Sequence, residues 1–387
     1  MTLPERGRPS IQIRELGSIG DVPAASWNRL AGTTCPFLRH EFLAALEDTR
    51  CVGPGTGWIP SHLAAFDGTE LVAAAPAYRK LHSWGEFVFD FSWAQAYARH
   101  GLAYYPKLVV AVPFSPVNAA RLLTAPGHDA TALRRLLVAA LEERCRSEGL
   151  SSAHALFLPE EEHRAFTTAG WLSREDVQFH WSNRGYAGFE DYLGQMRSEK
   201  RKQVRRERRR IAEGGIAFHT RHGHDITPAE LRFAFRMHER TFHLHGHEPY
   251  LNHAFFERIA RALPDAFMVK LAMRGEDPVA AAIFLAGEDT LYGRYWGAKD
   301  EMHSLHFEAC YYQGIDYCIE RGLARFEPGT QGEHKLVRGF EPTLTRSAHY
   351  IADQRFREAI ARFLEEERVA VDRYARAAAA HTPFHRA

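Results

Sequence analysis

The sequence predicts a mixed α/β protein built from two copies of one unit. Strand-like runs and amphipathic helices alternate through its 387 residues, as in layered α/β domains. The tetrapeptide VAAA occurs at 72–75 and again at 279–282, each time just after a charged hairpin turn. Two helix ends also correspond, since CRSEGLSSAHALF at 145–157 resembles CIERGLARFEP at 318–328. A matched order of elements indicates an internal repeat, so we expect two domains.

The first copy alternates short helices and strands. Strand-like runs flank Asp67-Gly68, a strong hairpin signal, and an amphipathic helix closes at Gly149. In order, the expected elements are helices at 25–32 and 40–50, strands within 61–80, a third strand at 85–93, a helix at 128–150, a strand at 152–159 and a helix at 160–171.

The second copy repeats this order. Residues 265–297 predict three strands joined by turns, 305–323 predict a helix closed by Gly322, and 324–328 predict the next strand. The first copy carries an additional Tyr- and Pro-rich insertion at 97–127, which looks functional because long irregular insertions often are.

These elements set the expected domain limits. A first domain spans 11–190 and a second spans 191–373, opening with a basic helix at 196–212; a loose tail covers 374–387. The basic helix also lies where the two copies join.

The overall composition excludes several classes of protein. The chain is 45% hydrophobic and 25% charged with a net charge of +1, which is ordinary globular usage. Five scattered cysteines without a C-x-x-C pair argue against a disulfide scaffold or a zinc ribbon. The N-terminus lacks an apolar segment, and no run of about 18 apolar residues occurs. We therefore expect a cytoplasmic protein without a transmembrane segment.

One segment carries a strong positive charge. Residues 197–210 contain nine Lys/Arg and two Glu, a net of +7, so the remainder sums to −6. Such a helix either contacts phosphates, on tRNA or a phosphorylated carrier, or is a solvated basic face. The candidate phosphate- or tRNA-binding residues are Lys200, Arg201, Lys202, Arg205, Arg206 and Arg209.

A histidine-rich segment spans 238–253 and includes the spacing H-x-H-x-H. Alternate histidines could ligate a metal on a strand, but the flanking residues predict a helix followed by a turn. We therefore expect no metal site and interpret the segment as a polar loop with one or two substrate-facing histidines.

The stretch QGEHKLVRGF at 331–340 crowds titratable groups at the end of a strand. His334 has the intrinsic pKa of a base near neutral pH, and Glu333 or Glu308 could serve if desolvation raised its pKa. Lys335 and Arg338 would neutralise a carboxylate, a phosphate or a developing oxyanion. The structural alternative is a set of ordinary strand-end salt bridges.

Four stretches carry a resemblance to a known family. They are FVFDFSWAQAYARHGLAYYPKLVVAVPFSP, MRSEKRKQVRRERRRI, LYGRYWGAKDEMHSLHFEACYYQGIDYCIERG and GTQGEHKLVRGFEPTLTRSAHY. From about residue 20 to 370 the chain resembles the bacterial Fem-like N-acyltransferases of the GNAT superfamily, often labelled peptidoglycan biosynthesis or recognition proteins. The resemblance implies tandem GNAT-like domains and transfer of an acyl or aminoacyl group to an amine, with both partners undefined.

The resemblance also implies where the site lies. In GNAT-like folds the fourth and fifth strands splay apart, here between 291–299 and 324–336. Lys335 aligns with the lysine of an F-K-x-x-F-G-like motif, spelt HKLVRGFE here, with His334 replacing the phenylalanine and the last two residues reversed. Candidate catalytic residues are His334, Glu333, Lys335 and Glu308. Candidate substrate-binding residues are Arg294, Tyr295, Trp296, Tyr311, Tyr312, Gln331 and Arg338.

The first copy offers further candidates for an acceptor pocket. Aromatic side chains with polar tips can stack on a ring, a sugar or a flexible chain. The residues are Asp90, Trp93, His100, Tyr104 and Lys107. The alternative is that the aromatic residues are core fillers.

The donor stays open between aminoacyl-tRNA and an acyl thioester on CoA or a carrier protein, with no tightly bound cofactor. A CoA-binding GNAT domain has a glycine-rich loop that cradles pyrophosphate on backbone N–H groups. Here that connection, GAKDEMHSLHFE, has no second glycine and three acids, which disfavours CoA unless His303 and His306 compensate.

The acceptor could be a peptidoglycan precursor, a peptide, an amino acid or a polyamine, and the oligomeric state is open. The competing class of protein is a non-catalytic binder of RNA or of cell-wall precursors, which would not need Glu333, His334 and Lys335 together.

Overall fold

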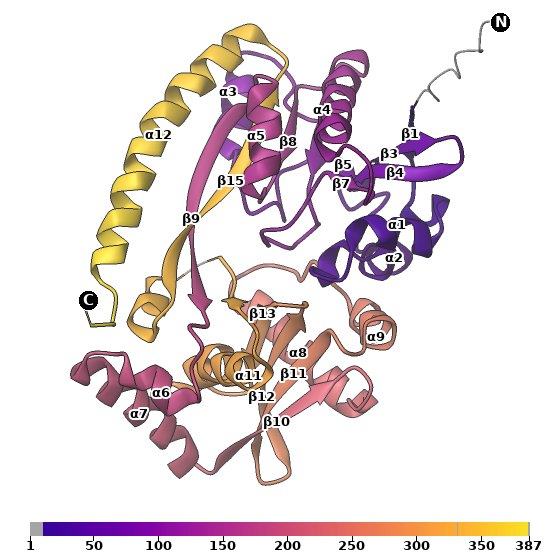
Figure 1. Cartoon of the computed structure of the whole chain (residues 1–387). Coiled ribbons are helices and arrows are strands. Elements are labelled where there is room, and N and C mark those ends of the chain that lie inside the picture. Colours follow the sequence, from indigo (N-terminus) through magenta and orange to yellow (C-terminus); the bar gives the residue numbers. More distant parts are fainter. Residues whose placement is uncertain (1–10, 331, 386–387) are drawn as a thin grey trace, which may run out of the picture.

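The computed structural model describes residues 11–330 and 332–385, which form two lobes joined by long strands and flanked by one long helix (Figure 1). In the N-terminal lobe the strands are β1 (Gln12–Leu16), β2 (Trp58–Pro60), β3 (His62–Asp67), β4 (Glu70–Ala75), β5 (Ala77–Lys80), β6 (Lys107–Val110), β7 (Leu123–Thr124) and β8 (Ser152–Ala155). Its helices are α1 (Ala24–Ala31), α2 (His40–Asp48), α3 (Phe91–Arg99), α4 (Ala130–Ser147) and α5 (Glu160–Thr168).

The C-terminal lobe follows a similar but shorter order of elements after two additional helices. Its strands are β10 (Ile216–His222), β11 (Phe267–Arg274), β12 (Asp277–Ala286), β13 (Thr290–Ala298) and β14 (Arg325–Glu327). Its helices are α6 (Phe189–Gly194), α7 (Ser198–Glu213), α8 (Pro228–Leu244), α9 (His253–Ala262), α10 (Leu305–Phe307) and α11 (Gln313–Arg321). The elements that join the lobes are β9 (Leu172–Ser182), β15 (Glu341–Ile351) and α12 (Gln354–Ala380).

The predicted repeat is visible in the strand pairing and in the helix ends. The pairs β6–β8 and β13–β14 are parallel, and the pairs on either side of each are antiparallel. The two VAAA segments lie in β4 and β12, each the second strand of an antiparallel hairpin, β3–β4 and β11–β12. After α4 the N–H of Leu150 donates to the Cys145 carbonyl at 2.9 Å, and after α11 the N–H of Leu323 donates to the Cys318 carbonyl at 2.9 Å. Gly149 and Gly322 take the left-handed φ values of +63° and +66° that this helix ending requires.

The two lobes exchange strands, so each lobe needs a strand shared with the other to complete its part of the sheet. An eleven-stranded sheet runs in the order β10-β11-β12-β13-β14-β9-β15-β8-β6-β5-β2, and a smaller sheet runs β1-β3-β4-β7. Strand β9 leaves the N-terminal lobe to pair with β14, while β15 returns from the C-terminal lobe to pair with β8. The two crossing strands pair with each other from Glu341–His180 to His349–Leu172.

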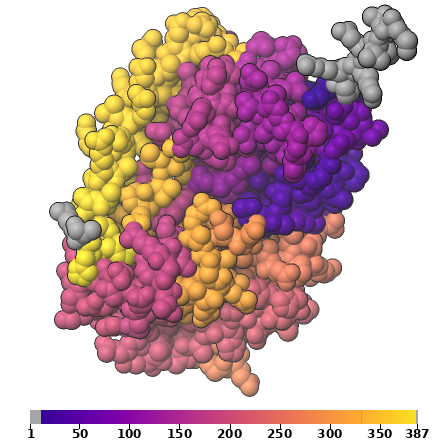
Figure 2. Space-filling view, viewed as in Figure 1, coloured from indigo at the N-terminus to yellow at the C-terminus, as the bar shows by residue number. Residues whose placement is uncertain are grey.

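Apolar packing also crosses between the lobes. Phe37 packs edge-on against Tyr292 with ring centroids 5.1 Å apart, and Phe42 packs against Phe255 at 5.4 Å. Helix α12 lies along one flank of both lobes (Figure 2), where Glu367 accepts two hydrogen bonds from Arg174 of β9 at 2.7 and 2.8 Å. The shared core holds the lobes in one arrangement and fixes the cleft between their elements.

The structure differs from the expected elements in three places. The strand expected at 85–93 is an irregular segment followed by α3, which begins at Phe91. The expected insertion at 97–127 contains β6, an integral strand between β5 and β8. The tail expected to be loose after 373 is the end of α12, and the ring of Phe384 beyond it is buried because it packs near Tyr192, 6.1 Å away. The expected domain boundary at 190/191 falls inside α6.

Within the described residues, no helix is both long enough and apolar enough to cross a membrane.

Candidate active site

A cavity opens where β13 and β14 part. The strands are paired in parallel from Thr290–Arg325 to Tyr292–Glu327. Beyond that point β13 continues to Ala298, while β14 ends and the chain turns at Gly329, whose φ of +99° suits glycine. The opening is about 390 Å³. Its walls come from β12, β13, the helix after β13 and the loop after β14.

A larger hollow of about 1140 Å³ continues this cavity along β13. The two spaces share His245, Arg294, Tyr295, Trp296 and His306 among their lining residues. Together they form one cleft over the open edge of β13, which we call the β13 cleft. The predicted residues Arg294, Tyr295 and Trp296 therefore lie together in it.

The helix on one wall of the β13 cleft contains a π-helical turn. Helix α10, a π turn at Glu308–Tyr312 and α11 are continuous. Such turns often occur at functional sites because they change which side chains face a cavity. Here Cys310 and Tyr311 line the cleft, whereas Glu308 and Tyr312 face the opposite side. Cys310 could not be found from the sequence, because a lone cysteine in a helix carries no spacing signal.

His334 lies in the cleft on a 3-10 helix, η4 (Glu333–Arg338). Its Nε2 is 2.7 Å from the Tyr311 hydroxyl, and the His306 and Phe307 rings lie 5.9 and 5.6 Å from its own. Burial lowers the pKa of His334, and the charges of Arg338 and Lys335 lower it further. A neutral imidazole at pH 7 is therefore available as a base.

Lys335 places a buried amine in the same cleft. The residue is only 1% exposed, and its Nζ donates to the Gly329 carbonyl at 2.6 Å. Among the described residues it forms no ion pair with a carboxylate. Burial lowers the pKa of Lys335 to about 7, so both protonation states are populated near neutral pH.

Three predicted cleft residues lie elsewhere. Glu308 accepts hydrogen bonds from Arg208 of α7 at 3.1 and 3.2 Å, and Tyr312 donates to Glu207 of α7 at 2.5 Å. The prediction that these side chains line the cleft is wrong, because α7 supplies their partners. Arg338 is the third: its guanidinium also bonds to Glu207 at 2.9 and 3.0 Å and donates to the His334 carbonyl at 2.7 Å. Arg338 therefore links η4 to α7 on the side away from the cleft.

Glu333 points away from His334 and Lys335. It lines a separate pocket of about 320 Å³ between β9, β15 and α12, where it accepts a hydrogen bond from the Tyr374 hydroxyl at 3.0 Å. It therefore lies on the other side of η4 from the β13 cleft. Gln331 was also predicted to bind substrate, but it lies outside the described residues.

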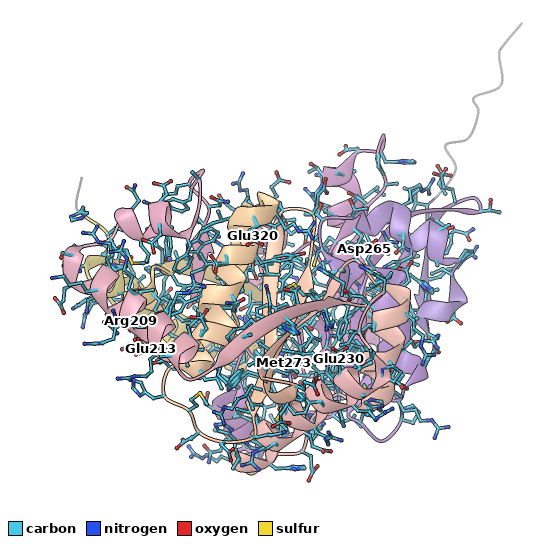
Figure 3. All side chains as sticks on the ribbon, turned by 90° about the horizontal axis from the view of Figure 1, so that it is seen from below. Arg209, Glu213, Glu230, Asp265, Met273 and Glu320 are labelled. Atoms are coloured by element: carbon cyan, nitrogen blue, oxygen red, sulfur yellow. The ribbon has the colours of Figure 1, made fainter. Side chains whose placement is uncertain are left out.

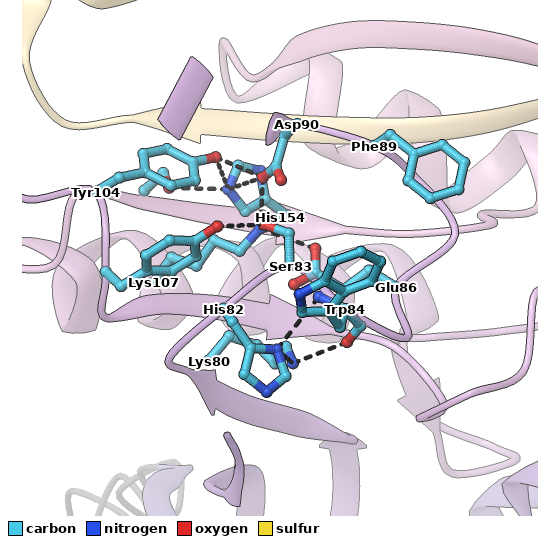
Figure 4. A network of polar contacts seen from close by, with 12 residues as sticks. Lys80, His82, Ser83, Trp84, Glu86, Phe89, Asp90, Tyr104, Lys107 and His154 are labelled. Carbon is cyan, nitrogen blue, oxygen red and sulfur yellow. Dashed lines mark hydrogen bonds and ion pairs between the residues drawn. The ribbon is translucent and has the colours of Figure 1, made fainter. Parts of the chain in front are cut away.

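The first-copy candidates do not form a pocket. Figure 4 shows Lys107 bonded to Glu86 at 2.8 Å and to Ser83 at 3.0 Å, and paired with Asp90. Tyr104 donates to Asp90 at 2.5 Å. Asp90, Tyr104 and Lys107 are buried and bonded to one another, which gives them a structural role, and their role in binding substrate stays a prediction.

Trp93 and His100 also have structural partners, and their predicted role in binding substrate stays untested. Trp93 is buried beside His349, with ring centroids 5.0 Å apart. His100 is exposed after α3, where its Nδ1 hydrogen-bonds to the Ala96 carbonyl at 2.9 Å and its ring packs on Phe356. Trp93 therefore fills part of the core, and His100 caps the end of α3.

The basic helix is α7, and it has two different faces. Val204, Glu207 and Ile211 are buried against the C-terminal lobe. The outward side chains Lys202, Arg205, Arg206 and Arg209 are exposed, and Lys200 and Arg201 are half-buried. Figure 3 shows Arg209 and Glu213 at the end of α7, on the underside of the molecule. Arg205 pairs with Glu190, and Arg209 lies 3.9 Å from Glu213.

In the histidine-rich segment, His238 is buried among aromatic rings, His243, His245 and His247 are exposed, and His253 is half-buried. His238 and His245 line the larger hollow of the β13 cleft. Over residues 11–330 and 332–385, no group of three His, Cys, Asp or Glu side chains is arranged to hold a metal ion.

Solved structures with similar folds cover most of the chain at low identity. FemX has 10% identity and a TM-score of 0.53, with 90% of this chain and 100% of that one covered. The C-terminal domain of a putative lysylphosphatidylglycerol synthetase from Agrobacterium fabrum has 10% identity and a TM-score of 0.52, covering 89% and 96%. L-PGS from Bacillus licheniformis has 10% identity and a TM-score of 0.50, covering 87% and 98%. No curated protein matches the chain significantly.

A family model decides the relationship. The FemAB-like model, described as peptidoglycan biosynthesis/recognition, matches residues 18–386. The predicted membership of the Fem-like family is confirmed by this match, and the chain shares its fold with FemX. The chain belongs to the FemAB-like family.

Proposed function

We propose that the protein forms an amide in the β13 cleft, by transferring an acyl or aminoacyl group from an activated donor to an amine. The observation that carries the proposal is the pair of groups on η4, His334 and Lys335, lining an opening between two parting strands. Acyl transfer needs a base for the attacking amine, a positive group or donor for the oxyanion, and a cleft that aligns the reactants.

The two groups take complementary roles. The neutral amine attacks the donor carbonyl, a C–N bond forms, and the Lys335 ammonium stabilises the oxyanion. His334 accepts the proton that the amine loses. As the bond to the leaving oxygen or sulfur breaks, that proton passes to the leaving group, with the Tyr311 hydroxyl 2.7 Å from the imidazole as a relay. The products are an amide and the free alcohol or thiol of the donor.

The donor proposed is aminoacyl-tRNA rather than acyl-CoA. Asp300 and Glu301 line the larger hollow at the turn after β13, where a pyrophosphate would meet repulsion. The exposed cations of α7 favour a large polyanion. The family description directs the search for an acceptor toward amines of peptidoglycan precursors.

The experiment is a transfer assay with labelled donors, namely aminoacyl-tRNA and acyl-CoA panels, against a panel of amines. We expect amide product with a charged tRNA, and the His334→Ala variant is expected to lose about 10²–10⁴-fold in rate, the usual contribution of a general base. Arg362→Ala, at an exposed position of α12, is the control and should retain kcat. Product formation that survives unchanged in His334→Ala would contradict the assigned base. Binding without transfer from any donor would favour a recognition protein.

Neutralising the outer face of α7 is expected to weaken tRNA binding. Lys202, Arg206 and Arg209 are exposed there, so the triple glutamine variant should flatten the plot of log K against log salt. Each lost phosphate contact lowers that slope by about 0.7–0.9. Filter binding at several salt concentrations measures it.

The matched control removes three exposed arginines from another helix. Arg362, Arg368 and Arg373 are exposed on α12, and their triple glutamine variant changes the net charge equally. If both triple variants shift the salt slope by the same amount, the effect is one of net charge and α7 is a solvated face.

A further inference from the structure

Nucleophilic side chains of four kinds face the smaller cavity of the β13 cleft. A thiol, a phenol, an amine and imidazoles line the opening of about 390 Å³, from Cys310, Tyr311, Lys335 and three histidines. In the proposed reaction the activated carbonyl of the donor enters this space. Each group could therefore take the acyl group in place of an acceptor amine, and its chemistry decides whether it keeps it.

Three of the four kinds do not keep an acyl group. Burial raises the pKa of the Cys310 thiol and of the Tyr311 hydroxyl, so both stay protonated at neutral pH and are weak nucleophiles. A neutral imidazole such as that of His334 can attack a carbonyl. The resulting acylimidazole is itself activated, however, and passes the acyl group to water or to an amine. Only the amine gives a stable amide.

The amine of Lys335 has nothing that keeps it protonated. Its Nζ donates to the Gly329 carbonyl at 2.6 Å, and among the described residues it forms no ion pair with a carboxylate. Burial lowers the pKa of Lys335 to about 7, so about half of the population carries a free amine at pH 7. Lys107 is also buried, but there Glu86 and Asp90 outweigh burial and raise the pKa.

We propose that Lys335 is also a site of self-acylation, at which an activated ester or thioester in the β13 cleft acylates the protein when no acceptor amine is present. The inference rests on the proposed function, because the donor enters the same cleft. The Nζ lone pair attacks the carbonyl carbon, a C–N bond forms, and the C–O or C–S bond of the donor breaks. The proton that Nζ loses passes to the leaving group, which departs as an alcohol or a thiol.

Self-acylation would switch the site off. An Nζ-acyl-lysine is an amide without charge, so it cannot supply the ammonium that stabilises the oxyanion. The acyl group also fills part of the cavity between β13 and the loop after β14. The modified protein should therefore lose transfer in proportion to the fraction of Lys335 that is acylated.

The reaction can be measured without tRNA and without an acceptor. The probe is p-nitrophenyl acetate, an activated ester that is small enough for the cavity, and initial rates of acetylation are read by digestion and mass spectrometry of the full-length protein. The chain has only seven lysines, so every one can be followed. An ordinary exposed lysine has about 10³-fold less free amine at pH 7 than a lysine of pKa 7. Allowing for restricted access, we expect Lys335 to react at least about tenfold faster than the exposed Lys202 of α7.

Lys80 is the matched control for the lowered pKa. It is fully buried, and burial lowers its pKa to about 7 as well, but its Nζ lies over the ring of Trp58, away from the cleft. We expect Lys335 to react at least about tenfold faster than Lys80. The ratio of the rates at Lys335 and Lys202 should fall about tenfold per pH unit above pH 7, because the free amine of Lys335 no longer increases there.

The outcomes separate this inference from the proposed function. If Lys335 reacts no faster than Lys80 or Lys202, or if its ratio to Lys202 does not change above pH 7, self-acylation in the cleft is wrong even where transfer is found. If Lys335 reacts selectively but no donor supports transfer to an amine, Lys335 stands as an acylation site and the proposed function fails.

Discussion

Replacing Lys335 by alanine is expected to lower kcat by about 10²–10³-fold, the effect of removing one donor to a developing oxyanion. The buried ammonium faces the cleft without a carboxylate partner among the described residues, so its charge is available to the transition state. The folded protein should tolerate the change, because it removes a buried cation and costs the Gly329 carbonyl one hydrogen bond without leaving a buried carboxylate unpaired. Steady-state transfer rates and melting temperatures test both statements.

A buried lysine outside the cleft is the matched control. Lys270 on β11 is 6% exposed and lies over the ring of Tyr317, and it does not line the cleft. We expect Lys270→Met to retain kcat. If Lys335→Ala also retains kcat, the oxyanion role assigned to Lys335 is wrong.

The pH dependence gives a second measure of Lys335. Because its pKa is about 7, the ammonium is lost as the pH rises through 7, and its contribution to kcat/KM is lost with it. Lys335→Arg keeps the positive charge, since arginine does not titrate in this range. The ratio of variant to wild-type kcat/KM should therefore rise about tenfold per pH unit above pH 7, and taking the ratio cancels the titration of the amine. A constant ratio would contradict the assignment.

The repeat could be predicted from the sequence because the same helix ending occurs twice. Cys145 and Cys318 each begin a C-x-x-x-G-L helix ending, and each ending returns the chain into a strand of the parallel pair. Glycine in the left-handed region can be read from sequence because other residues are disfavoured there. The exchange of β9 and β15 between the lobes could not be read in this way, since pairing between strands more than 140 residues apart leaves no local signal.

The site was predicted in part for the same reason. His334 and Lys335 could be placed near the parting strands from their position after β14. Glu308 and Tyr312 could not be separated from Tyr311, because the π turn changes the phase of the helix and α7 supplies the buried partner Glu207. Asp90 and Lys107 are 17 residues apart, and opposite charges at that spacing indicate neither a pocket nor a buried pair.

Removing Lys107 is the change expected to cost the most stability. Lys107→Met leaves Glu86 and Asp90 buried without their cation, and breaking a buried pair in this way costs about 3–5 kcal/mol. The damage should reach both lobes, because His154 of β8 hydrogen-bonds to His349 of β15 at 2.7 Å beside the pair. Burial lowers the pKa of His154 to about 3 and that of His349 well below its usual value, so neither imidazole replaces the lost charge.

The pH dependence of this loss identifies its cause. In the wild type, the Lys107 ammonium holds the pKa of Asp90 below its usual value despite burial. The stability that the Asp90 carboxylate contributes is therefore present at neutral pH and is lost only in strong acid. Burial already raises the pKa of Glu86 to about 7. Without Lys107 both carboxyls have raised pKa values in the folded state, which then binds more protons than the unfolded chain. The deficit of the variant should thus be largest at pH 7 and above and shrink toward pH 4.

Denaturant unfolding at pH 4 and pH 7 measures the deficit, with Lys299→Met as the control. Lys299 is partly exposed and pairs with Asp277 at the surface, so its loss should cost under about 1 kcal/mol at either pH. The triple variant Lys107→Met/Glu86→Gln/Asp90→Asn removes the orphaned charges and should recover part of the lost stability at pH 7. A deficit that is equal at both pH values and is not reduced in the triple variant would mean that lost packing, rather than uncompensated charge, destabilises Lys107→Met.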